Sequence, residues 1–189
     1  SKKIPTKIGY IPNACDYSEN DIERRVNHIL RDVTLLEELG LQVETLDLRE
    51  YFDRKYELKK KLEDLGAVFV SGGNVFILRQ AMKLSGLDEI LVEFKNNNSD
   101  FLYSGYSAGG CVLAPDLKAY TIVDSPADKP YKELQETIWE GLGFIDYAFM
   151  PHFNSNHPES ESIDKEIEFC KKNNIIYKAV RDGEVIIIE

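Results

Sequence analysis

The stretch Phe101-Leu-Tyr-Ser-Gly-Tyr-Ser-Ala-Gly-Gly-Cys-Val-Leu113 decides the fold of this chain. Its apolar start stops at Ser104-Gly105, and its end is apolar again, so we expect a strand, a tight turn and a buried helix. A serine at the apex of such a turn needs strained backbone angles and small neighbours, and glycine and alanine flank Ser107. Ser107 is therefore a candidate nucleophile that projects from a sheet edge. The alternative is a plain strand-to-helix turn whose glycines only allow close packing.

Composition predicts one globular domain. The chain has 189 residues, of which 43% are hydrophobic and 30% charged, and its formal net charge is −10. That charge argues against nucleic acid and anionic membranes as partners. No apolar run approaches the roughly 20 residues that cross a bilayer, and the first residues lack the apolar core of a signal peptide. We expect a cytoplasmic protein.

The cysteine pattern excludes a disulfide framework. Cys15, Cys111 and Cys170 are widely spaced, odd in number and without a C-x-x-C pair, so they fit neither disulfides nor a zinc site. We expect reduced and mostly buried thiols.

Strands alternate with helices through most of the chain, which predicts a three-layer α/β domain (αβα) with a mainly parallel sheet. The predicted strands are 7–12, 41–48, 67–70, 101–103, 120–123, 141–150, 175–180 and 184–189. The predicted helices are 22–39, 58–65, 75–82, 87–94 and 160–173. The first helix carries an apolar stripe that should be buried, and His28 lies off this stripe as an expected surface residue. Arg181-Asp-Gly183 predicts a hairpin turn.

Two glycine-containing turns should meet at one edge of this sheet. Ser71-Gly-Gly-Asn74 and Gly105-Tyr-Ser-Ala-Gly109 both follow predicted strands, and sites of parallel sheets lie at the carboxyl ends of the strands. His152 follows another predicted strand and Pro151, so we expect it to serve Ser107 as a base. Otherwise it is a loop histidine packed on Phe153. We expect His157 to be a turn residue.

A catalytic histidine needs an acceptor on its other nitrogen, and a reacting carbonyl needs donors for its oxyanion. Asp182, Asp124 and Asp116 are the candidate acceptors. The backbone amides of Ala108, just after the nucleophile, and Gly73, on the facing turn, are the candidate donors. This chemistry needs no metal and no organic cofactor.

Three ordered motifs carry a family resemblance: Ser71-Gly-Gly-Asn74, Gly105-Tyr-Ser-Ala-Gly109 and Pro151-His-Phe153. Together they resemble the peptidase E (aspartyl dipeptidase, S51) family of serine peptidases over nearly the whole chain. The resemblance implies an α/β fold like that of class I glutamine amidotransferases. It implies Ser107 as nucleophile, His152 as base and Gly73 in the oxyanion hole.

The third triad member and the substrate follow less directly from the resemblance. An acid in an acid-Gly turn near the C-terminus has this role in the family, which favours Asp182 and leaves Asp124 in reserve. A second acidic position proposed for the family falls near Ala119 here. Family members usually carry a further strand and helix before the segment that opens this chain, so the single domain 1–189 is expected to lack them.

Aspartyl dipeptidases have arginine after the histidine motif. This chain has acids there, so we expect little preference for an acidic residue. The acids are Glu159, Glu161, Asp164 and Glu166.

The expected function is a serine-type peptidase, dipeptidase- or exopeptidase-like, that cleaves small peptides through an acyl-enzyme. An α/β-hydrolase esterase or amidase shares the G-x-S-x-G motif but places its histidine near the end of a longer chain. A glutamine amidotransferase would carry cysteine in place of Ser107. A binding module without catalysis, in which the acidic segment after His152 docks a cationic ligand, is the remaining alternative. The sequence leaves the oligomeric state open.

Overall fold

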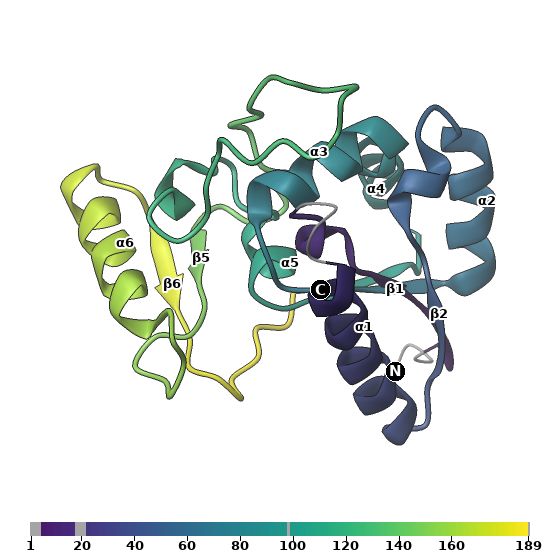
Figure 1. Ribbon diagram of the computed structural model, residues 1–189, viewed down its shortest axis with the longest axis horizontal. Helices are drawn as coiled ribbons and strands as arrows, with labels where there is room; N and C mark the ends of the chain where they lie inside the picture. Colours follow the sequence, from purple (N-terminus) through teal and green to yellow (C-terminus); the bar gives the residue numbers. More distant parts are fainter. Residues whose placement is uncertain (1–4, 18–21, 98, 189) are drawn as a thin grey trace.

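A parallel sheet forms the centre of the molecule. The structure, a computed structural model, describes residues 5–17, 22–97 and 99–188. Within them, β1 (Lys7–Ile11), β2 (Gln42–Thr45), β3 (Ala67–Val70) and β4 (Leu102–Gly105) lie in the order β2-β1-β3-β4, and each neighbouring pair is parallel (Figure 1). The predicted α/β class with a mainly parallel sheet is confirmed.

Helices cover both faces of this sheet, as two neighbouring residues of β1 demonstrate. The Tyr10 hydroxyl donates to Asp32 of α1 (Ile22–Glu38) at 2.9 Å. A Cβ on Gly9 would instead lie 3.0 Å from Leu65 of α2 (Lys55–Leu65). Successive residues of a strand point to opposite faces, so α1 and α2 lie on opposite sides of the sheet.

The core is richest around α3 (Val75–Ser85), which begins where β3 ends. Asn74 caps this helix, since its side-chain oxygen accepts hydrogen bonds from the backbone amides of Phe76 and Ile77. Most of α3 is buried. Gly86, with φ +74°, ends α3, and α4 (Leu87–Asn96) follows directly.

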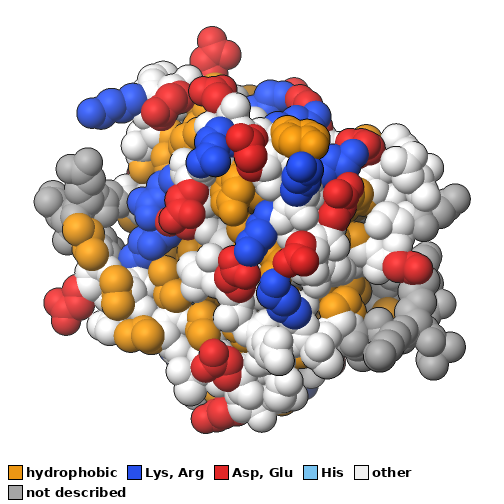
Figure 2. Space-filling view, turned by 90° about the vertical axis from the view of Figure 1, so that its right-hand side faces the viewer, with side chains coloured by type: hydrophobic (Ala, Val, Ile, Leu, Met, Phe, Trp, Pro, Cys, Tyr) orange, Lys and Arg blue, Asp and Glu red, His pale blue; other side chains and the backbone are white. Residues whose placement is uncertain are grey.

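The charged face of the lysine-rich helix α2 lies in solvent, while Leu58, Leu62 and Leu65 on its other face are buried. Figure 2 shows the side of the molecule where α2 lies in Figure 1, with basic and acidic side chains interspersed. Lys55 contacts Glu89 at 2.6 Å, and Lys61 pairs with Glu44. Exposed pairs of this kind contribute little to stability but keep the surface polar.

Helix α1 forms as predicted, but the prediction of a buried apolar stripe is wrong. Leu36 is buried, whereas Ile22 is 65% exposed and Leu30 is 59% exposed. The helix instead turns a polar face inward, because Asp32 is buried and accepts the Tyr10 hydroxyl. Gly40, with φ +84°, follows the helix end.

A second, two-stranded sheet carries the C-terminal part of the described chain. The short strands β5 (Ala148–Met150) and β6 (Tyr177–Ala179) pair in parallel, with α6 (Ser160–Lys172) between them in sequence. They confirm only the ends of two longer predicted strands. The described residues include no helix with the length and apolar content needed to cross a membrane.

Two further sequence predictions fail here. Residues 120–123 are not a strand: a 3-10 helix (Lys118–Tyr120) begins the segment, and the Tyr120 hydroxyl accepts from the Phe149 amide. The turn at Arg181–Gly183 exists, since Glu184 donates to the Arg181 carbonyl at 3.0 Å, but residues 184–188 form no strand. Asp182 in this turn contacts His152 instead of shaping a hairpin.

Candidate active site

Ser107 lies at the apex between β4 and the short helix α5 (Ala108–Cys111), as the motif predicts. Its φ of +48° is uncommon for a residue with a side chain. Close packing imposes this geometry, because a Cβ on Gly109 would lie 2.4 Å from the Val70 carbonyl oxygen. Only glycine fits there, so the turn is fixed by backbone contacts with the neighbouring strand.

The Gly72-Gly73 turn lies directly against this apex. A Cβ on Gly72 would lie 3.0 Å from the Ser107 Cβ, and one on Gly73 would lie 2.4 Å from the Ala14 carbonyl oxygen. Gly73 also has φ +138°. Ser107 and both glycines line one cavity of about 210 Å³. Gly73 and Ala108, the expected oxyanion donors, thus lie on the facing turn and next to Ser107.

His152 lies on the same cavity and is held by Asp182. Its Nδ1 is 2.7 Å from the Asp182 Oδ1, and its side chain is 12% exposed. The Asp182 amide donates to the Ser155 hydroxyl at 2.9 Å, which ties the turn to the loop that follows β5. His152 and Ser107 also line a second, more apolar cavity of about 530 Å³. The structure therefore brings Ser107, His152 and Asp182 to one rim of the molecule.

The other two candidate acids have different partners. Half-buried Asp124 accepts a hydrogen bond from the Val75 amide at 2.8 Å, at the start of α3. Burial raises the pKa of this carboxyl to about 7. The Asp116 carboxylate accepts hydrogen bonds from the backbone amide and from the ammonium group of Lys118. Of the three acids, Asp182 is the one hydrogen-bonded to His152.

Sequence reasoning missed the wall of the cavity that α1 supplies. His28 is expected to be a surface residue off the apolar stripe, but it lines the cavity with Ser107. Its Nε2 lies 2.9 Å from the Tyr106 hydroxyl and 3.3 Å from Asp32. The hydrogen bond to Asp32 raises the pKa of His28 to about 9. The prediction for His28 is therefore wrong, because a long-range contact with the residue before the nucleophile determines its place.

Asp32 is the centre of this network. It accepts hydrogen bonds from the Tyr106 hydroxyl at 2.6 Å and from Arg31 at 2.7 Å, besides the one from Tyr10. Burial alone would raise the pKa of Asp32, but the hydrogen bonds from His28, Tyr106, Arg31 and Tyr10 together hold it well below its usual range. The carboxylate stays charged and links α1 to the elbow.

Guanidinium groups also reach the cavity, from α1 and not from the segment after His152. Arg24, Arg25 and Arg31 all line it. Arg24 and Arg31 flank His28 at four and three residues along the helix, a spacing that puts all three on one helix face. This spacing is the feature of the sequence that indicates a basic helix face, which in the structure forms the α1 wall of the cavity. The acidic residues after His152 predict a site poor in guanidinium groups, but these arginines enter the cavity from a distant helix.

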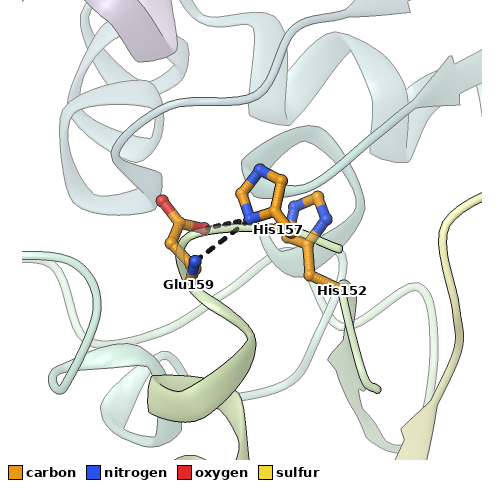
Figure 3. Close-up of side chains that lie close together, drawn as sticks. All are labelled: His152, His157 and Glu159. Atoms are coloured by element: carbon orange, nitrogen blue, oxygen red, sulfur yellow. Dashed lines mark hydrogen bonds and ion pairs between the residues drawn. The ribbon is translucent and has the colours of Figure 1, made fainter. Parts of the chain in front are cut away.

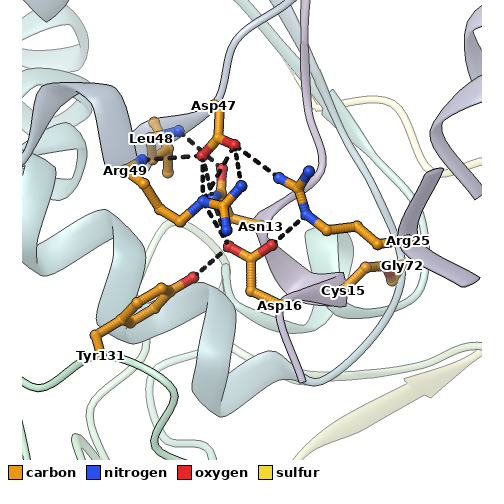
Figure 4. A network of polar contacts seen from close by, with 9 residues as sticks. All are labelled: Asn13, Cys15, Asp16, Arg25, Asp47, Leu48, Arg49, Gly72 and Tyr131. Carbon is orange, nitrogen blue, oxygen red and sulfur yellow. Dashed lines mark hydrogen bonds and ion pairs between the residues drawn. The ribbon is translucent and has the colours of Figure 1, made fainter. Parts of the chain in front are cut away.

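Arg25 belongs to a polar network that fixes the loop after β1 (Figure 4). It donates to Asp16 at 2.5 Å and to Asp47 at 2.8 Å. The neighbouring Cys15 thiol lies 3.2 Å from the Gly72 carbonyl oxygen. The network therefore supports the glycine turn that faces Ser107. Cys15, Cys111 and Cys170 are all free and buried, as predicted.

His157 lies against His152 and is more than a turn residue. The two imidazole rings are stacked, with centroids 3.7 Å apart and an angle of 7° between their planes. The Glu159 backbone amide donates to the His157 Nδ1 at 3.2 Å (Figure 3). The base candidate is thus braced by Asp182 at one nitrogen and by His157 on one ring face.

Known proteins resemble this chain along most of its length. The model of peptidase family S51 matches residues 1–189. The uncharacterized peptidase Lmo0363 of Listeria monocytogenes is 30% identical over 89% of this chain and 76% of its own length. The uncharacterized peptidase Lin0382 of Listeria innocua is 30% identical over 78% of this chain. A protein named peptidase E from Streptomyces coelicolor is 31% identical over 68% of this chain. The chain spans 65% of the length of the Listeria innocua relative and 51% of that of the Streptomyces protein.

A solved structure extends the likeness to the fold. A crystal structure named for peptidase E, from Listeria monocytogenes EGD-e, superposes with a TM-score of 0.71 at 27% sequence identity. The match covers 98% of this chain and 87% of the other. A family match along the whole chain, a relative at 30% identity and a shared fold lead to one conclusion: this chain belongs to peptidase family S51.

Proposed function

We propose that this chain is a serine-type peptidase that hydrolyses small peptides, in the manner of a dipeptidase or exopeptidase, through an acyl-enzyme on Ser107. The observation that carries the proposal is the 2.7 Å contact between His152 Nδ1 and Asp182 on the cavity that Ser107 lines. An acid on Nδ1 leaves Nε2 as the basic nitrogen of the ring. The family supports peptide hydrolysis as the reaction class.

In the proposed first half-reaction, the Ser107 Oγ attacks the peptide carbonyl and His152 Nε2 accepts the hydroxyl proton. The oxygen of the tetrahedral intermediate receives hydrogen bonds from the Gly73 and Ala108 amides. Asp182 stabilises the imidazolium by accepting a hydrogen bond from its Nδ1–H, and the proton stays on the ring. His152 then protonates the leaving amine, which departs and leaves an ester on Ser107.

In the second half-reaction, water replaces the amine. His152 Nε2 accepts a proton from the water as it attacks the ester carbonyl, and then returns that proton to Ser107. The product acid departs and the enzyme is regenerated. No step requires a metal or an organic cofactor.

The size of the cavity supports a small substrate. Its volume of about 210 Å³ lies below the range of typical ligand pockets, which begins at roughly 300 Å³. The α1 wall and the stacked His157 bound it on the side away from the apolar cavity. In this proposal the small cavity takes one side of the scissile bond and the apolar cavity of about 530 Å³ takes the other, so we expect short peptides.

Labelling with a fluorophosphonate tests the nucleophile. We expect the wild-type chain to form a covalent adduct at Ser107, located by mass spectrometry, and Ser107→Ala to form none. A dipeptide and tripeptide panel, assayed for turnover on the same preparations, then defines the substrate. A folded wild-type protein that binds dipeptides in a thermal-shift assay but neither hydrolyses them nor reacts with the probe would instead be a binding module.

A further inference from the structure

Three potential metal ligands converge at the mouth of the cavity. One nitrogen each of His152 and His157 and one carboxylate oxygen of Glu159 all lie within 4.8 Å of one another. Figure 3 shows the three side chains side by side on the loop between β5 and α6. The side chains of His157 and Glu159 are 32% and 42% exposed, so an ion has a path from solvent.

The donors match those of zinc sites. In open sites Zn²⁺ binds two imidazole nitrogens and one carboxylate oxygen, and water takes the fourth position. The hard ions Mg²⁺ and Ca²⁺ prefer oxygen ligands and fit this set poorly. The ligand chemistry therefore selects a borderline-soft divalent ion.

Contacts around His152 supply a second, independent indication. Histidines that bind metals usually donate their other ring N–H to a carboxylate, which fixes the tautomer and leaves one lone pair for the ion. Asp182 at 2.7 Å from the His152 Nδ1 is such a partner, so Nε2 is the nitrogen available to a metal. The arrangement prepares His152 as a ligand as well as a base.

The geometry requires only a modest rearrangement. Bond lengths of about 2.1 Å in a tetrahedral site put the ligand atoms about 3.4 Å apart. In the structure the three ligand atoms lie within 4.8 Å of one another, so they must move closer together. The stacked rings must also turn so that their lone pairs converge. Residues 152, 157 and 159 belong to one surface loop, so side-chain rotations and small loop shifts suffice.

The local charge permits a cation despite the arginines of the α1 wall. Arg25 is paired with Asp16 and Asp47, and Arg31 with Asp32. Asp182 and Glu159 add negative charge beside the two imidazoles. Arg25 and Arg31 thus carry their own counter-charges, while the histidine side of the cavity presents carboxylates.

We propose that His152, His157 and Glu159 bind Zn²⁺ and that the bound ion switches the enzyme off. The Nε2 lone pair of His152 forms the bond to zinc, and any proton on that nitrogen is released to solvent. The same lone pair then cannot accept the Ser107 proton. This inference rests on the proposed function, because inhibition requires His152 to be the base. Zinc is an inhibitor here, and the reaction itself runs without it.

Calorimetric titration of the full chain with ZnCl₂ tests the site without reference to activity. We expect one zinc per wild-type chain and the same binding by Ser107→Ala. His157→Gln and Glu159→Gln should each weaken binding at least about tenfold, since each removes one ligand. His28→Gln is the matched control, because His28 lines the same cavity outside the cluster, and it should bind as the wild type does. Absence of binding, or equal binding by His157→Gln and Glu159→Gln, would overturn the proposal.

Inhibition is measured as the rate of fluorophosphonate labelling with and without zinc. We expect micromolar zinc to slow wild-type labelling more than tenfold, chelator to restore it, and Mg²⁺ to have no effect. Each variant is compared with its own metal-free rate, and Glu159→Gln should lose the zinc response. Zinc that binds without slowing a labelled enzyme would refute the inhibitory role. A wild-type chain that never labels while Ser107→Ala still binds zinc would refute the proposed function and leave the metal site standing.

Discussion

Ser107 and His152 both have positive φ values, +48° and +60°, yet the molecule holds them by different means. Ser107 is fixed by backbone packing, since Gly109 fits against the Val70 carbonyl only because it has no side chain. His152 is fixed by side chains, namely the Asp182 carboxylate and the stacked ring of His157. Steric packing cannot relax without moving strands, whereas side-chain contacts can be lost singly.

This difference separates stability from activity. A change at the elbow must disturb the sheet, because β3 and β4 are adjacent strands of it. A change beside His152 affects a loop and an exposed turn, and Asp182 is 48% exposed. We therefore expect damage near Ser107 to lower both the free energy of unfolding and the rate, and damage near His152 to lower the rate alone.

The largest effect should come from Asp182→Asn. An asparagine amide does not stabilise the imidazolium, so we expect kcat/KM to fall about 10³-fold, which is about 4 kcal/mol in the barrier. The melting temperature should hardly change, because exposed ion pairs contribute little to stability. Asp164→Asn, on the exposed face of α6, is the control and should keep full activity. A large loss of stability in Asp182→Asn would break the comparison.

Gly109→Ala should come next, with a cost in stability as well as rate. Its Cβ would lie 2.4 Å from the Val70 carbonyl oxygen, and we expect a loss of about 3 kcal/mol in the free energy of unfolding. Gly143→Ala is the control: its positive φ of +63° strains a new side chain, but no heavy atom lies within 4 Å of the new Cβ. In urea denaturation that control should lose about 1 kcal/mol in the free energy of unfolding. Equal losses for the two variants would show that packing does not fix the elbow.

The sequence predicted the elbow side of the site better than the base side. Strands β1, β3 and β4 are apolar segments of a parallel sheet, and the glycines next to Ser107 report local steric needs, so both signals are contained in short stretches. The turn with Asp182 was also visible locally, but only the family resemblance favoured this acid over Asp124 and Asp116 as the partner of the histidine. A D-G turn predicts a hairpin, but here its acid is hydrogen-bonded to a histidine 30 residues earlier in the chain.

The failures share one physical cause, which is long-range contact. The stripe of α1 predicts burial, but Asp32 and its bond to Tyr10 turn the helix the other way. His28 joins the site because Tyr106, 78 residues later, is its partner. In the segment 120–123 Tyr120 is buried at the end of a 3-10 helix and Ile122 is 44% exposed, so its apolar residues do not indicate a strand. The periodicity of apolar residues indicates which face of an element is apolar, but it does not identify the distant residues that the element contacts.

A third test uses two acids, the buried Glu166 and the half-buried Asp124, that share a small cavity with Ser107. Burial raises the pKa of Glu166 to about 8 and that of Asp124 to about 7. The folded protein therefore holds these protons more tightly than the unfolded chain, whose carboxyls titrate near pH 4. Stability from this source is complete below pH 4 and falls as the pH rises toward 8.

Removing one of these acids should flatten that profile. Between pH 5 and pH 8.5 the free energy of unfolding should fall in both proteins. We expect the fall to be roughly 2 kcal/mol smaller in Glu166→Gln than in the wild type, measured by urea denaturation at each pH. Glu168→Gln, exposed on the same helix, changes the net charge equally and should follow the wild type. Parallel profiles for wild type and Glu166→Gln would mean that no proton is held there.

The smallest effect should come from Tyr106→Phe, which asks whether side-chain contacts also hold the elbow. The lost hydroxyl donates to Asp32 at 2.6 Å, and Asp32 keeps its bonds from Tyr10 and Arg31, so we expect about 1 kcal/mol less stability. If backbone packing alone fixes Ser107, the fluorophosphonate labelling rate should change less than about threefold, since such a change is about 0.6 kcal/mol in the barrier. Tyr56→Phe, which is 67% exposed, is the control for both measurements. A labelling rate reduced more than tenfold would mean that the α1 network positions the nucleophile, and that the two halves of the site are held by the same means after all.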